Sequence, residues 1–471
     1  MRVDTVIIGA GTAGLSALRE VRRYTDDYVL INDGHWGTTC AAVGCMPSKA
    51  LIEAANVFHR RHGFDDLGIR GGDGMRADIP AVLARVRRLR DSFVEGPEAV
   101  PDELGRRAIS GRAVLQAADR VEVNGDVIES RAIILAPGSR PAVPKAWQAF
   151  GDRILTTDNL FEQHDLPRRI AVVGMGPLGI ELAQALARLG LDVAGFDAVE
   201  QLAGIDDPEV LSAFHALVET EMRLHLGGAA ELEESGEAIG VVGAGGRFEA
   251  DAVLAAMGRR PNIEGLGLEV LGVPLDDKGM PEVNPATLRI GDLPIFLAGD
   301  ANGLRPLLHE AADEGHIAGR LAAPKADAAP LCRRTPLSIV FASPQIARVG
   351  PPLSELDDRD IVSASADYSN QGRARIAQSA GGLLRIHAEQ KSGRLVAAEM
   401  CAPQAEHLAH LLALAVEREM TVDDLLAMPF YHPVLEEGLR GALRDLTKSV
   451  EHATGGSELS RCENIGYDAL D

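Results

Sequence analysis

The chain has 471 residues, enough for about three domains, and a formal net charge of −22 that argues against a nucleic-acid-binding protein, which needs basic surfaces. Aromatic residues are scarce (4%) and glycines abundant (50), which favours an α/β protein with many tight turns. A strand pattern starts almost at the N-terminus, where a secretory signal would stand, and no apolar run approaches the ~18 residues of a membrane span. We therefore expect a cytoplasmic protein whose thiols stay reduced.

The first predicted elements are a buried strand, a glycine-rich turn and a helix, within residues 5–23. Three glycines in the turn have the spacing G-x-G-x-x-G: Gly9, Gly11 and Gly14. The first permits the tight turn, the second lets a pyrophosphate approach the backbone, and the third lets helix and strand pack closely. The next strand, YVLIND, ends at Asn32 and Asp33, where an acidic group would bind a ribose. The pattern predicts a dinucleotide site; a plain glycine turn is the alternative.

Two of the five cysteines, Cys40 and Cys45, lie close together in the stretch CAAVGCMPSK. Positions five apart in an ideal helix are separated by ~7.5 Å along its axis, whereas the Cα atoms of a disulfide lie ~4.4–6.8 Å apart. Because Pro47 is tolerated in a first helical turn, we expect a helix to begin near Cys45 and Met46, with Cys40 folded back in the preceding loop. A helix N-terminus lowers the pKa of a thiol such as that of Cys45.

Three interpretations of the cysteine pair remain. A zinc half-site needs a second pair with ligand spacing, and the other cysteines are isolated: Cys332, Cys401 and Cys462. Two inert thiols are the second interpretation. A redox-active disulfide is the third, and the predicted helix terminus together with the flanking dinucleotide motifs favours it.

A second strand–turn–helix pattern follows an apolar strand at 131–141 that ends at Gly138 and Ser139. Its glycines repeat the spacing of the first pattern: Gly174, Gly176 and Gly179. The next strand ends at Asp197, and an acid there binds the 2′-hydroxyl of NAD and repels the 2′-phosphate of NADP. No arginine stands in FDAVEQLAG, where an NADP enzyme would place one. The chain is therefore predicted to bind two dinucleotides.

Two more apolar strands, at 252–262 and 292–302, also end in glycine. The first ends at Gly258, and the second at Gly299 and Asp300. Ligands of open α/β sheets gather at the carboxyl ends of strands. Asp300 is therefore a candidate binding residue, with a plain strand end as the alternative.

Towards the C-terminus, the sequence contains an apolar helical pattern and a histidine that is a candidate catalytic residue. Residues 406–420 have leucine and valine at helical spacing, which indicates a core helix or a subunit interface. His432 precedes a proline, and Glu437 follows five positions later. A histidine oriented by a carboxylate suits a general base. From the residues alone, a helix-start or core histidine is the alternative.

Together these motifs resemble the flavoprotein disulfide reductases that use pyridine nucleotides, over nearly the whole chain. The resemblance is carried by both glycine motifs, by Glu181 after the second, and by five other stretches: CAAVGCMPSKAL, LAPGS, GRRPN, LAGDA and HPVLEE. The disulfide motif, which closes with Pro-Ser-Lys-Ala-Leu, is most similar to that of the dihydrolipoamide dehydrogenases. Cys462 is single, unlike the C-terminal cysteine pair of mercuric reductases.

The resemblance implies an α/β chain with two tandem Rossmann-like dinucleotide-binding domains and a C-terminal α+β dimerisation domain. The implied order is an FAD-binding domain, an NAD-binding domain, a central segment that completes the FAD domain, and an interface domain: 1–147, 148–268, 269–334 and 335–471. It also implies a homodimer with active sites shared between subunits. The implied partner is a lipoylated carrier protein or acyltransferase core.

Individual roles follow from the same resemblance. Cys40 would meet the dithiol, and Cys45 would donate charge to the flavin. His432, held by Glu437, would deprotonate the dithiol, whose pKa is near ~8.5. The residues expected at FAD are Gly9, Gly11, Gly14, Asn32, Asp33, Thr39, Lys49, Gly138, Ser139 and Asp300. Those expected at NAD are Gly174, Gly176, Gly179, Glu181, Asp197 and Gly258, with Glu181 also paired to Lys49 near flavin N5.

The implied reaction is oxidation of protein-bound dihydrolipoamide by NAD⁺ through FAD and a redox-active disulfide. The alternatives are a related NAD(P)H-dependent reductase of another disulfide or low-molecular-weight thiol, and a docking subunit without turnover. Asp197 disfavours a glutathione-type reductase, because those enzymes usually prefer NADP. The sequence departs from the family where Asn32 replaces a glutamate, where Thr38 replaces a glycine, and where AAVG replaces LNVG. These departures concern the affinity for FAD.

Overall fold

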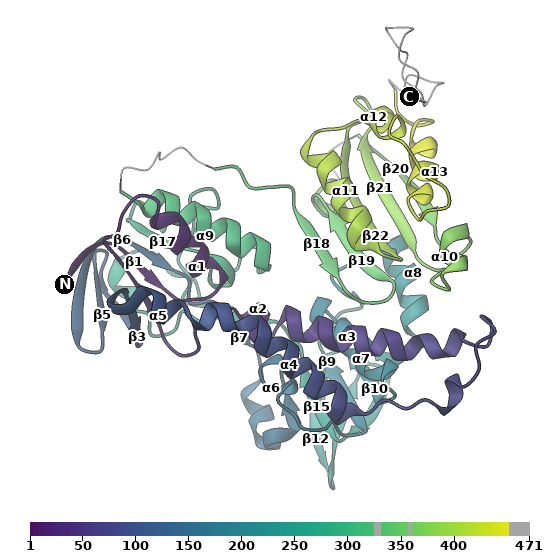
Figure 1. Ribbon diagram of the computed structural model, residues 1–471, viewed down its shortest axis with the longest axis horizontal. Helices are drawn as coiled ribbons and strands as arrows, with labels where there is room; N and C mark the ends of the chain where they lie inside the picture. The colour runs from purple at the N-terminus through teal and green to yellow at the C-terminus, as the bar shows by residue number, and fades with distance from the viewer. Residues whose placement is uncertain (325–330, 357–359, 452–471) are drawn as a thin grey trace.

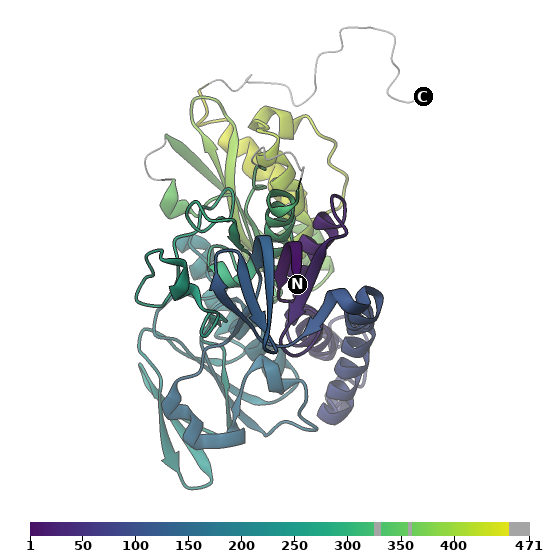
Figure 2. The same ribbon diagram turned by 90° about the vertical axis from the view of Figure 1, so that its left-hand side faces the viewer.

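The computed structural model describes residues 1–324, 331–356 and 360–451 (Figure 1). Cys462 and the end of the expected interface domain lie outside these ranges. In the described residues, three larger sheets and two smaller ones make up a mixed α/β fold with their helices, which confirms the predicted fold class (Figures 1 and 2). Among the described helices, none has the length and apolar character needed to cross a membrane.

The first sheet has the hydrogen-bonded order β3-β2-β1-β6-β5-β4, and β17 pairs with β6. Its strands are β1 (Arg2–Ile8), β2 (Tyr28–Asn32), β3 (Ala108–Ser110), β4 (Ala113–Ala117), β5 (Arg120–Val123), β6 (Asp126–Leu135) and β17 (Ile295–Leu297). β1 is parallel to β2 and β6, and the apolar runs of these strands are buried because helices and loops cover both faces. β17 belongs to the expected central segment and returns to this sheet; the domain boundaries themselves stay predictions.

Helices α1 (Thr12–Val21) and α9 (Leu308–Ala322) cross closely on the first sheet. A Cβ atom at Gly315 would lie 2.1 Å from the carbonyl oxygen of Ala13, and one at Gly319 would lie 2.7 Å from that of Ala17. Glycines on α9 therefore let the two backbones touch. This close contact holds the turn between β1 and α1 against the segment that follows β17.

Between β2 and β3 the chain forms a helical excursion. Its elements are α2 (Thr39–Ala42), α3 (Cys45–His59), η1 (Arg60–Gly63), η2 (Gly72–Gly74), α4 (Ile79–Glu98), α5 (Val100–Leu104) and η3 (Gly105–Arg107). Leu51 and Ala55 of α3 pack with Leu83 and Val86 of α4 in one buried cluster, which also includes Ile180 of the second domain. The excursion thereby ties the first domain to the second.

The second domain contains a parallel sheet of order β11-β10-β9-β15-β8 and an antiparallel meander β12-β13-β14. Its elements are η4 (Lys145–Arg153), β8 (Ile154–Leu155), α6 (Thr157–Leu160), β9 (Arg169–Val173), α7 (Pro177–Arg188), β10 (Asp192–Phe196), α8 (Pro208–Val218), β11 (Arg223–His225), β12 (Glu231–Ser235), β13 (Ala238–Gly243), β14 (Gly246–Ala250) and β15 (Ala252–Ala255). Strands β7 (Ser139–Pro141) and β16 (Arg259–Pro261) pair where the chain enters and leaves this domain. The elements η5 (Leu268–Leu271) and η6 (Gly299–Asn302) flank the return to the first sheet.

The third domain has an antiparallel sheet of order β18-β19-β22-β21-β20, with helices against it (Figure 1). Its elements are β18 (Leu337–Val340), β19 (Gln345–Val349), η7 (Leu353–Glu355), β20 (Ile361–Asp367), α10 (Gly372–Ile376), β21 (Leu383–Glu389), β22 (Leu395–Ala402), α11 (Ala405–Glu417), α12 (Val422–Leu426) and α13 (Glu437–Leu446). Leu408 and Leu412 of α11 are buried in the core of this domain. Of the two interpretations of residues 406–420, the structure therefore shows a core helix for the face that carries Leu408 and Leu412.

Candidate active site

The two cysteines lie on consecutive helices. Cys40 is the second residue of α2, and α3 begins at Cys45, as predicted. Gly44 joins the two helices, and a Cβ atom there would lie only 3.0 Å from a carbonyl oxygen of α2. The absence of a side chain at Gly44 therefore lets the chain fold back and bring the two thiols together.

The prediction of a loop at Cys40 is wrong, because Thr38 caps a turn of helix there. The hydroxyl oxygen of Thr38 accepts a hydrogen bond from the amide of Ala41 at 3.1 Å. Threonine is a favoured N-cap residue because it satisfies an amide that has no partner inside the helix. Thr39, expected at FAD, is the first residue of this helix. The departure from glycine at Thr38 thus has a structural role.

The two thiols have opposite pKa shifts. A hydrogen bond from the Cys40 thiol lowers the pKa of Cys45 to about 7 against the opposing effect of burial, and the charge of Lys49 lowers it further. The same hydrogen bond and burial raise the pKa of Cys40. Cys45 is therefore the thiolate of the reduced pair at and above neutral pH, and Cys40 keeps its proton.

Lys49 and Glu181 form an ion pair across two domains, which confirms their predicted pairing. Lys49 Nζ lies 2.8 and 3.1 Å from the two carboxylate oxygens of Glu181, whose side chain is only 4% exposed. The amide of Phe341, from the third domain, donates to Glu181 Oε1 at 2.7 Å. Lys49 Nζ also lies 4.6 Å from the centre of the Phe341 ring. The sequence gives no signal for Phe341, because only the folded chain brings it to this pair.

Helix α7 carries two more polar side chains that contact neighbouring domains. Gln184 Oε1 accepts a hydrogen bond from the amide of Ser343 at 2.7 Å. Arg188 donates to Asn56 Oδ1 at 2.6 Å. One face of α7 thus binds both α3 and the turn between β18 and β19.

The two glycine-rich turns leave room for a pyrophosphate. In the first turn, a Cβ atom at Gly9 or Gly14 would lie 2.1 or 1.8 Å from backbone oxygen, whereas at Gly11 it would meet no atom within 4 Å. The second turn repeats this pattern, with 2.4 Å at Gly174, 1.8 Å at Gly179 and open space at Gly176. The outer glycines serve packing, and the middle one leaves open the approach to the N-terminus of α1 or α7. These residues fit FAD at the first turn and NAD at the second.

Asn32 and Asp197 have equivalent positions in the two domains. Asn32 Oδ1 accepts a hydrogen bond from the amide of Ala10 at 3.0 Å, and Asp197 Oδ2 accepts one from Met175 at 2.6 Å. Each side chain therefore braces a glycine-rich turn from the end of the next strand. The carboxylate of Asp197 places a negative charge beside the ribose position, which fits a preference for NAD.

The side-chain amide of Asn32 also organises the loop that follows it. Asn32 Nδ2 donates hydrogen bonds to the carbonyl oxygens of Gly34 at 3.3 Å and His35 at 2.9 Å. A carboxylate cannot donate these bonds, so this loop is suited to asparagine and not to the family's glutamate. Asp33 beside it is exposed.

We expect Asn32→Asp to lower the thermal midpoint of unfolding, Tm. The buried carboxylate would lie against two carbonyl oxygens that lose their donor, and such a loss costs about 1–3 kcal/mol. Scanning calorimetry of the FAD-loaded variant measures the change. Asp26→Asn, on the exposed turn before the same strand, is the matched control. An Asn32→Asp protein as stable as this control would contradict the role of the amide.

Asp300 lies in η6, just after β17, and joins a polar network between the domains. Ser139 donates from its hydroxyl to Asp300 Oδ2 at 2.8 Å, and Arg259 Nε donates to that hydroxyl oxygen at 2.7 Å. The pairing of β7 with β16 brings the segments after Gly138 and Gly258 together. Arg259 was not predicted as a site residue, although its position directly after Gly258 in GRRPN is a usable signal.

His432 and Glu437 meet at the start of α13. The imidazole Nδ1 lies 3.0 and 3.2 Å from the carboxylate oxygens, and this hydrogen bond lowers the pKa of Glu437. The His432 side chain is 80% exposed and borders a cavity of about 400 Å³ that Asp367 and Arg373 also line. Within the described part of one chain, no hydrogen bond or ion pair joins His432 to Cys40 or Cys45. Because Nδ1 makes the contact with Glu437 and the side chain is exposed, Nε2 is accessible to another group.

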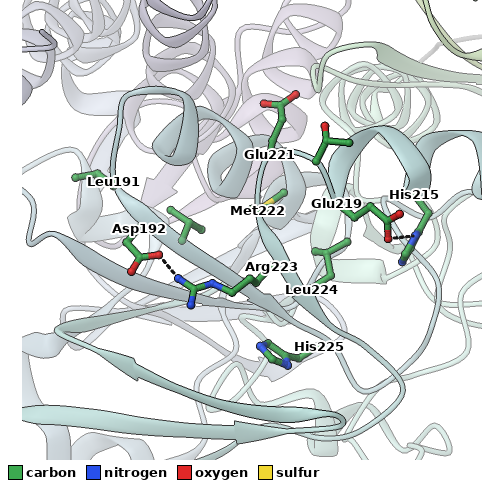
Figure 3. Close-up of a pocket in the computed structure, with 11 residues that line it drawn as sticks. Leu191, Asp192, His215, Glu219, Glu221, Met222, Arg223, Leu224 and His225 are labelled. Atoms are coloured by element: carbon green, nitrogen blue, oxygen red, sulfur yellow. Dashed lines mark hydrogen bonds and ion pairs between the residues drawn. The ribbon is translucent and has the colours of Figure 1, made fainter.

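A cavity of about 500 Å³ lies on the second domain, lined by residues of β10, β11 and the end of α8 with the loop after it (Figure 3). Asp192 and Arg223, at the starts of β10 and β11, form an ion pair on its wall, and His215 faces Glu219 at 3.4 Å on another side. Dinucleotides bind at the carboxyl ends of strands, so this cavity is distinct from the expected NAD site.

Comparison with protein families identifies the architecture. Residues 3–315 match the family model described as "Pyridine nucleotide-disulphide oxidoreductase", and residues 337–443 match the dimerisation domain of that family. The chain belongs to this family. It is therefore an oxidoreductase that uses FAD and a pyridine nucleotide, and its third domain is a dimerisation domain, which supports a homodimer.

Individual relatives cover almost the whole chain. Dihydrolipoyl dehydrogenase 3 of Pseudomonas aeruginosa is 30% identical over 94% of this chain and 97% of its own length. Dihydrolipoyl dehydrogenase of Thermus scotoductus is 30% identical over 95% and 98%. The crystal structure of LpdA from Mycobacterium tuberculosis has a TM-score of 0.81 at 26% identity and covers 94% of this chain and 100% of its own. RclA of Escherichia coli, an HOCl-induced flavoprotein disulfide reductase solved as a Cu(II) complex, has a TM-score of 0.81 at 19% identity over 94% and 99%, and shares the fold.

Proposed function

We propose that this pyridine nucleotide-disulphide oxidoreductase is an FAD-dependent dihydrolipoamide dehydrogenase that uses NAD⁺. The main support is the cysteine pair: Cys45, with its pKa lowered to about 7, lies beside Lys49 and bonds to a Cys40 that keeps its proton. Such a pair suits a disulfide that is opened by an external thiolate and leaves one stable internal thiolate. The names of the relatives at 30% identity support the dithiol substrate.

The reaction needs a base, because the dithiol of dihydrolipoamide is protonated at neutral pH. We assign this role to His432. Glu437 accepts the hydrogen bond from Nδ1–H, which fixes Nε2 as the proton acceptor and stabilises the imidazolium that forms.

The substrate thiolate then attacks the sulfur of Cys40 in the Cys40–Cys45 disulfide. The internal S–S bond breaks, its electron pair goes to Cys45, and a mixed disulfide joins substrate to Cys40. The second substrate thiol loses its proton and attacks the mixed disulfide, which releases oxidised lipoamide and returns a thiol at Cys40. Lys49 stabilises the negative charge left on Cys45.

Bound FAD supplies a two-electron acceptor between the Cys45 thiolate and NAD⁺. Gly11 would leave its phosphates access to the N-terminus of α1, and Asp300 with Ser139, and Lys49 with Glu181, would hold it beside the cysteines. Gly176 and Asp197 would bind and orient NAD⁺ in the second domain. Because a dithiol substrate persists only where thiols are kept reduced, we place the protein in the cytoplasm.

We also propose that His432 serves the cysteines of the partner subunit in a two-fold dimer. Support comes from its 80% exposed imidazole and from the place of both His432 and Glu437 within the dimerisation domain at residues 337–443. A two-fold axis would create two identical sites, each built from both chains.

The deciding experiment is turnover with free dihydrolipoamide. The expected result is formation of NADH from dihydrolipoamide and NAD⁺, followed by the absorbance of NADH. No such turnover, together with NADH oxidation by another disulfide, would assign the related-reductase alternative. No turnover with any disulfide would favour a docking subunit. Capture of lipoylated proteins from native lysate by the active enzyme would then identify the carrier.

Nucleotide preference is a separate prediction. We expect kcat/KM to be higher for NAD⁺ than for NADP⁺ by at least about tenfold, because Asp197 repels a 2′-phosphate and a desolvated charge repulsion exceeds about 1.4 kcal/mol. Asp197→Asn should narrow this ratio while it keeps the hydrogen bond from Met175. Equal kcat/KM values in the unchanged protein would refute the argument from Asp197.

A further inference from the structure

The loop that follows Asp197 is held from the third domain. Arg348 on β19 donates a hydrogen bond from Nη1 to the carbonyl oxygen of Gly204 at 3.2 Å. Ser354 donates from its amide and its hydroxyl to the carboxylate of Asp206, at 2.9 and 3.0 Å. These contacts come from two elements of the dimerisation domain, and both reach a loop that belongs to the nucleotide-binding domain.

Buried charges complete the contact. Glu399 on β22 is 5% exposed, and its carboxylate accepts hydrogen bonds from the amides of Asp206 and Asp207. Asp207 is fully buried, caps α8 through the amides of its first turn, and binds Arg385 Nε at 3.0 Å. Buried charges are costly unless they are paired, so this set of contacts fixes the position of residues 204–207 closely.

The same loop carries a strained residue next to the dinucleotide turn. Ala203 has φ of +57°, in the left-handed region that disfavours residues with a side chain. Its amide donates to the carbonyl oxygen of Met175 at 2.8 Å, while the amide of Met175 donates to Asp197. Met175 lies between Gly174 and Gly176 in the turn. A strained conformation of this kind persists only where its surroundings over-determine it.

We propose that Glu399 and Asp207 are positioning residues for the pyridine nucleotide: they hold loop 203–207 so that Ala203 supports the phosphate-binding turn at Met175. The affinity for NAD(H) is thereby set in part by the dimerisation domain, through residues that do not touch the nucleotide. The proposal rests on the assignment of the second glycine-rich turn as the NAD site and adds nothing to the dithiol chemistry.

The test measures the dissociation constant of NAD⁺ for the oxidised, FAD-loaded enzyme by calorimetric titration, without any dithiol present. Glu399→Ala is expected to raise this Kd by about 2- to 30-fold, the range of mutations that act through a positioned element. The FAD content of the variant should stay unchanged, which a general loss of structure would not allow. If Glu399→Ala does not fold, Arg348→Met is the second variant. This substitution, at a half-exposed position, removes the hydrogen bond to Gly204.

The decisive variant is Ala203→Gly combined with Glu399→Ala. Glycine adopts positive φ without strain, so in the Glu399→Ala background it should return the Kd towards the original value. Gln378→Ala is the matched control, because Gln378 joins the dimerisation domain to Gly63 and Asp66 of the first domain and should leave the Kd unchanged.

Two results would overturn the proposal: a Kd for NAD⁺ that Glu399→Ala leaves unchanged, or a raised Kd that Ala203→Gly does not restore. Because no dithiol is used, an enzyme that binds NAD⁺ as expected yet fails to oxidise dihydrolipoamide contradicts the proposed substrate and leaves this inference standing.

Discussion

Replacement of His432 by glutamine should lower kcat for dihydrolipoamide oxidation by about 10²–10⁴-fold, the usual contribution of a general base. Glutamine keeps the size of the side chain but cannot take the proton of the dithiol. NADH-dependent reduction of ferricyanide, which needs no dithiol, should survive. The control is His410→Gln, which replaces a different exposed histidine, located on α11. It should leave both activities unchanged. A loss of less than about tenfold in His432→Gln would reject the assignment of the base.

Subunit mixing then shows which chain supplies the base. We expect Cys45→Ser and His432→Gln to be inactive alone, and dimers that contain one chain of each to have one intact site and one doubly altered site. Random exchange makes about half of all dimers mixed, so recovered activity should approach about a quarter of the unaltered enzyme. If each site lay within one chain, every site would carry a lesion. No recovery, with exchange verified by mass, would therefore reject the shared site.

Substitution of Cys45 by serine should abolish dithiol turnover, by more than about 10³-fold, because the internal disulfide cannot form. Two-electron reduction of the enzyme under anaerobic conditions should produce a long-wavelength charge-transfer band from the Cys45 thiolate to FAD. Cys45→Ser should lack this band. Cys40→Ser should also lose turnover but keep a thiolate at Cys45, and so should show the band without reduction. A band that persists in Cys45→Ser would show that another group donates the charge.

The same band should follow the pKa of Cys45. Because that pKa is lowered to about 7, the thiolate is present above pH 7, and the band should fade as the pH falls through this value. Lys49→Met should move the midpoint upwards, since the positive charge that favours the thiolate is gone. The negative charge of Glu181 acts in the opposite direction, so Glu181→Gln should move the midpoint downwards.

Local patterns were sufficient to predict the parts of the fold that depend on near neighbours in the chain. The G-x-G-x-x-G turns predicted the two dinucleotide folds, because strand, turn and helix follow one another directly in the chain. The start of α3 at Cys45 was predictable from Pro47 for the same reason. The short helix at Cys40 was missed, since capping by Thr38 was read only as a departure from a family glycine.

Contacts between distant segments could not be predicted from patterns. Phe341 reaches Lys49 and Glu181 only because β18 of the third domain ends beside α7. Glu399 and Asp207 lie 192 positions apart in sequence, and neither stands in a recognisable motif. The apolar face of α11 was compatible with a core or an interface, and only the position of the sheet against it decides for the core.

Helix α7 has a consequence for protein engineering. It begins at the nucleotide-binding turn, yet Glu181 binds Lys49 and Phe341, and Gln184 and Arg188 bind Ser343 and Asn56. A chimaera that exchanges the whole segment 148–268 for that of another reductase must keep Glu181, Gln184 and Arg188. Without them it would lose these bonds to both neighbouring domains, and its redox centre would change together with its nucleotide preference. The nucleotide-binding domain therefore cannot be exchanged independently of its neighbours. Substitutions intended to change the preference between NAD and NADP are better confined to the few residues after β10, where they leave α7 intact.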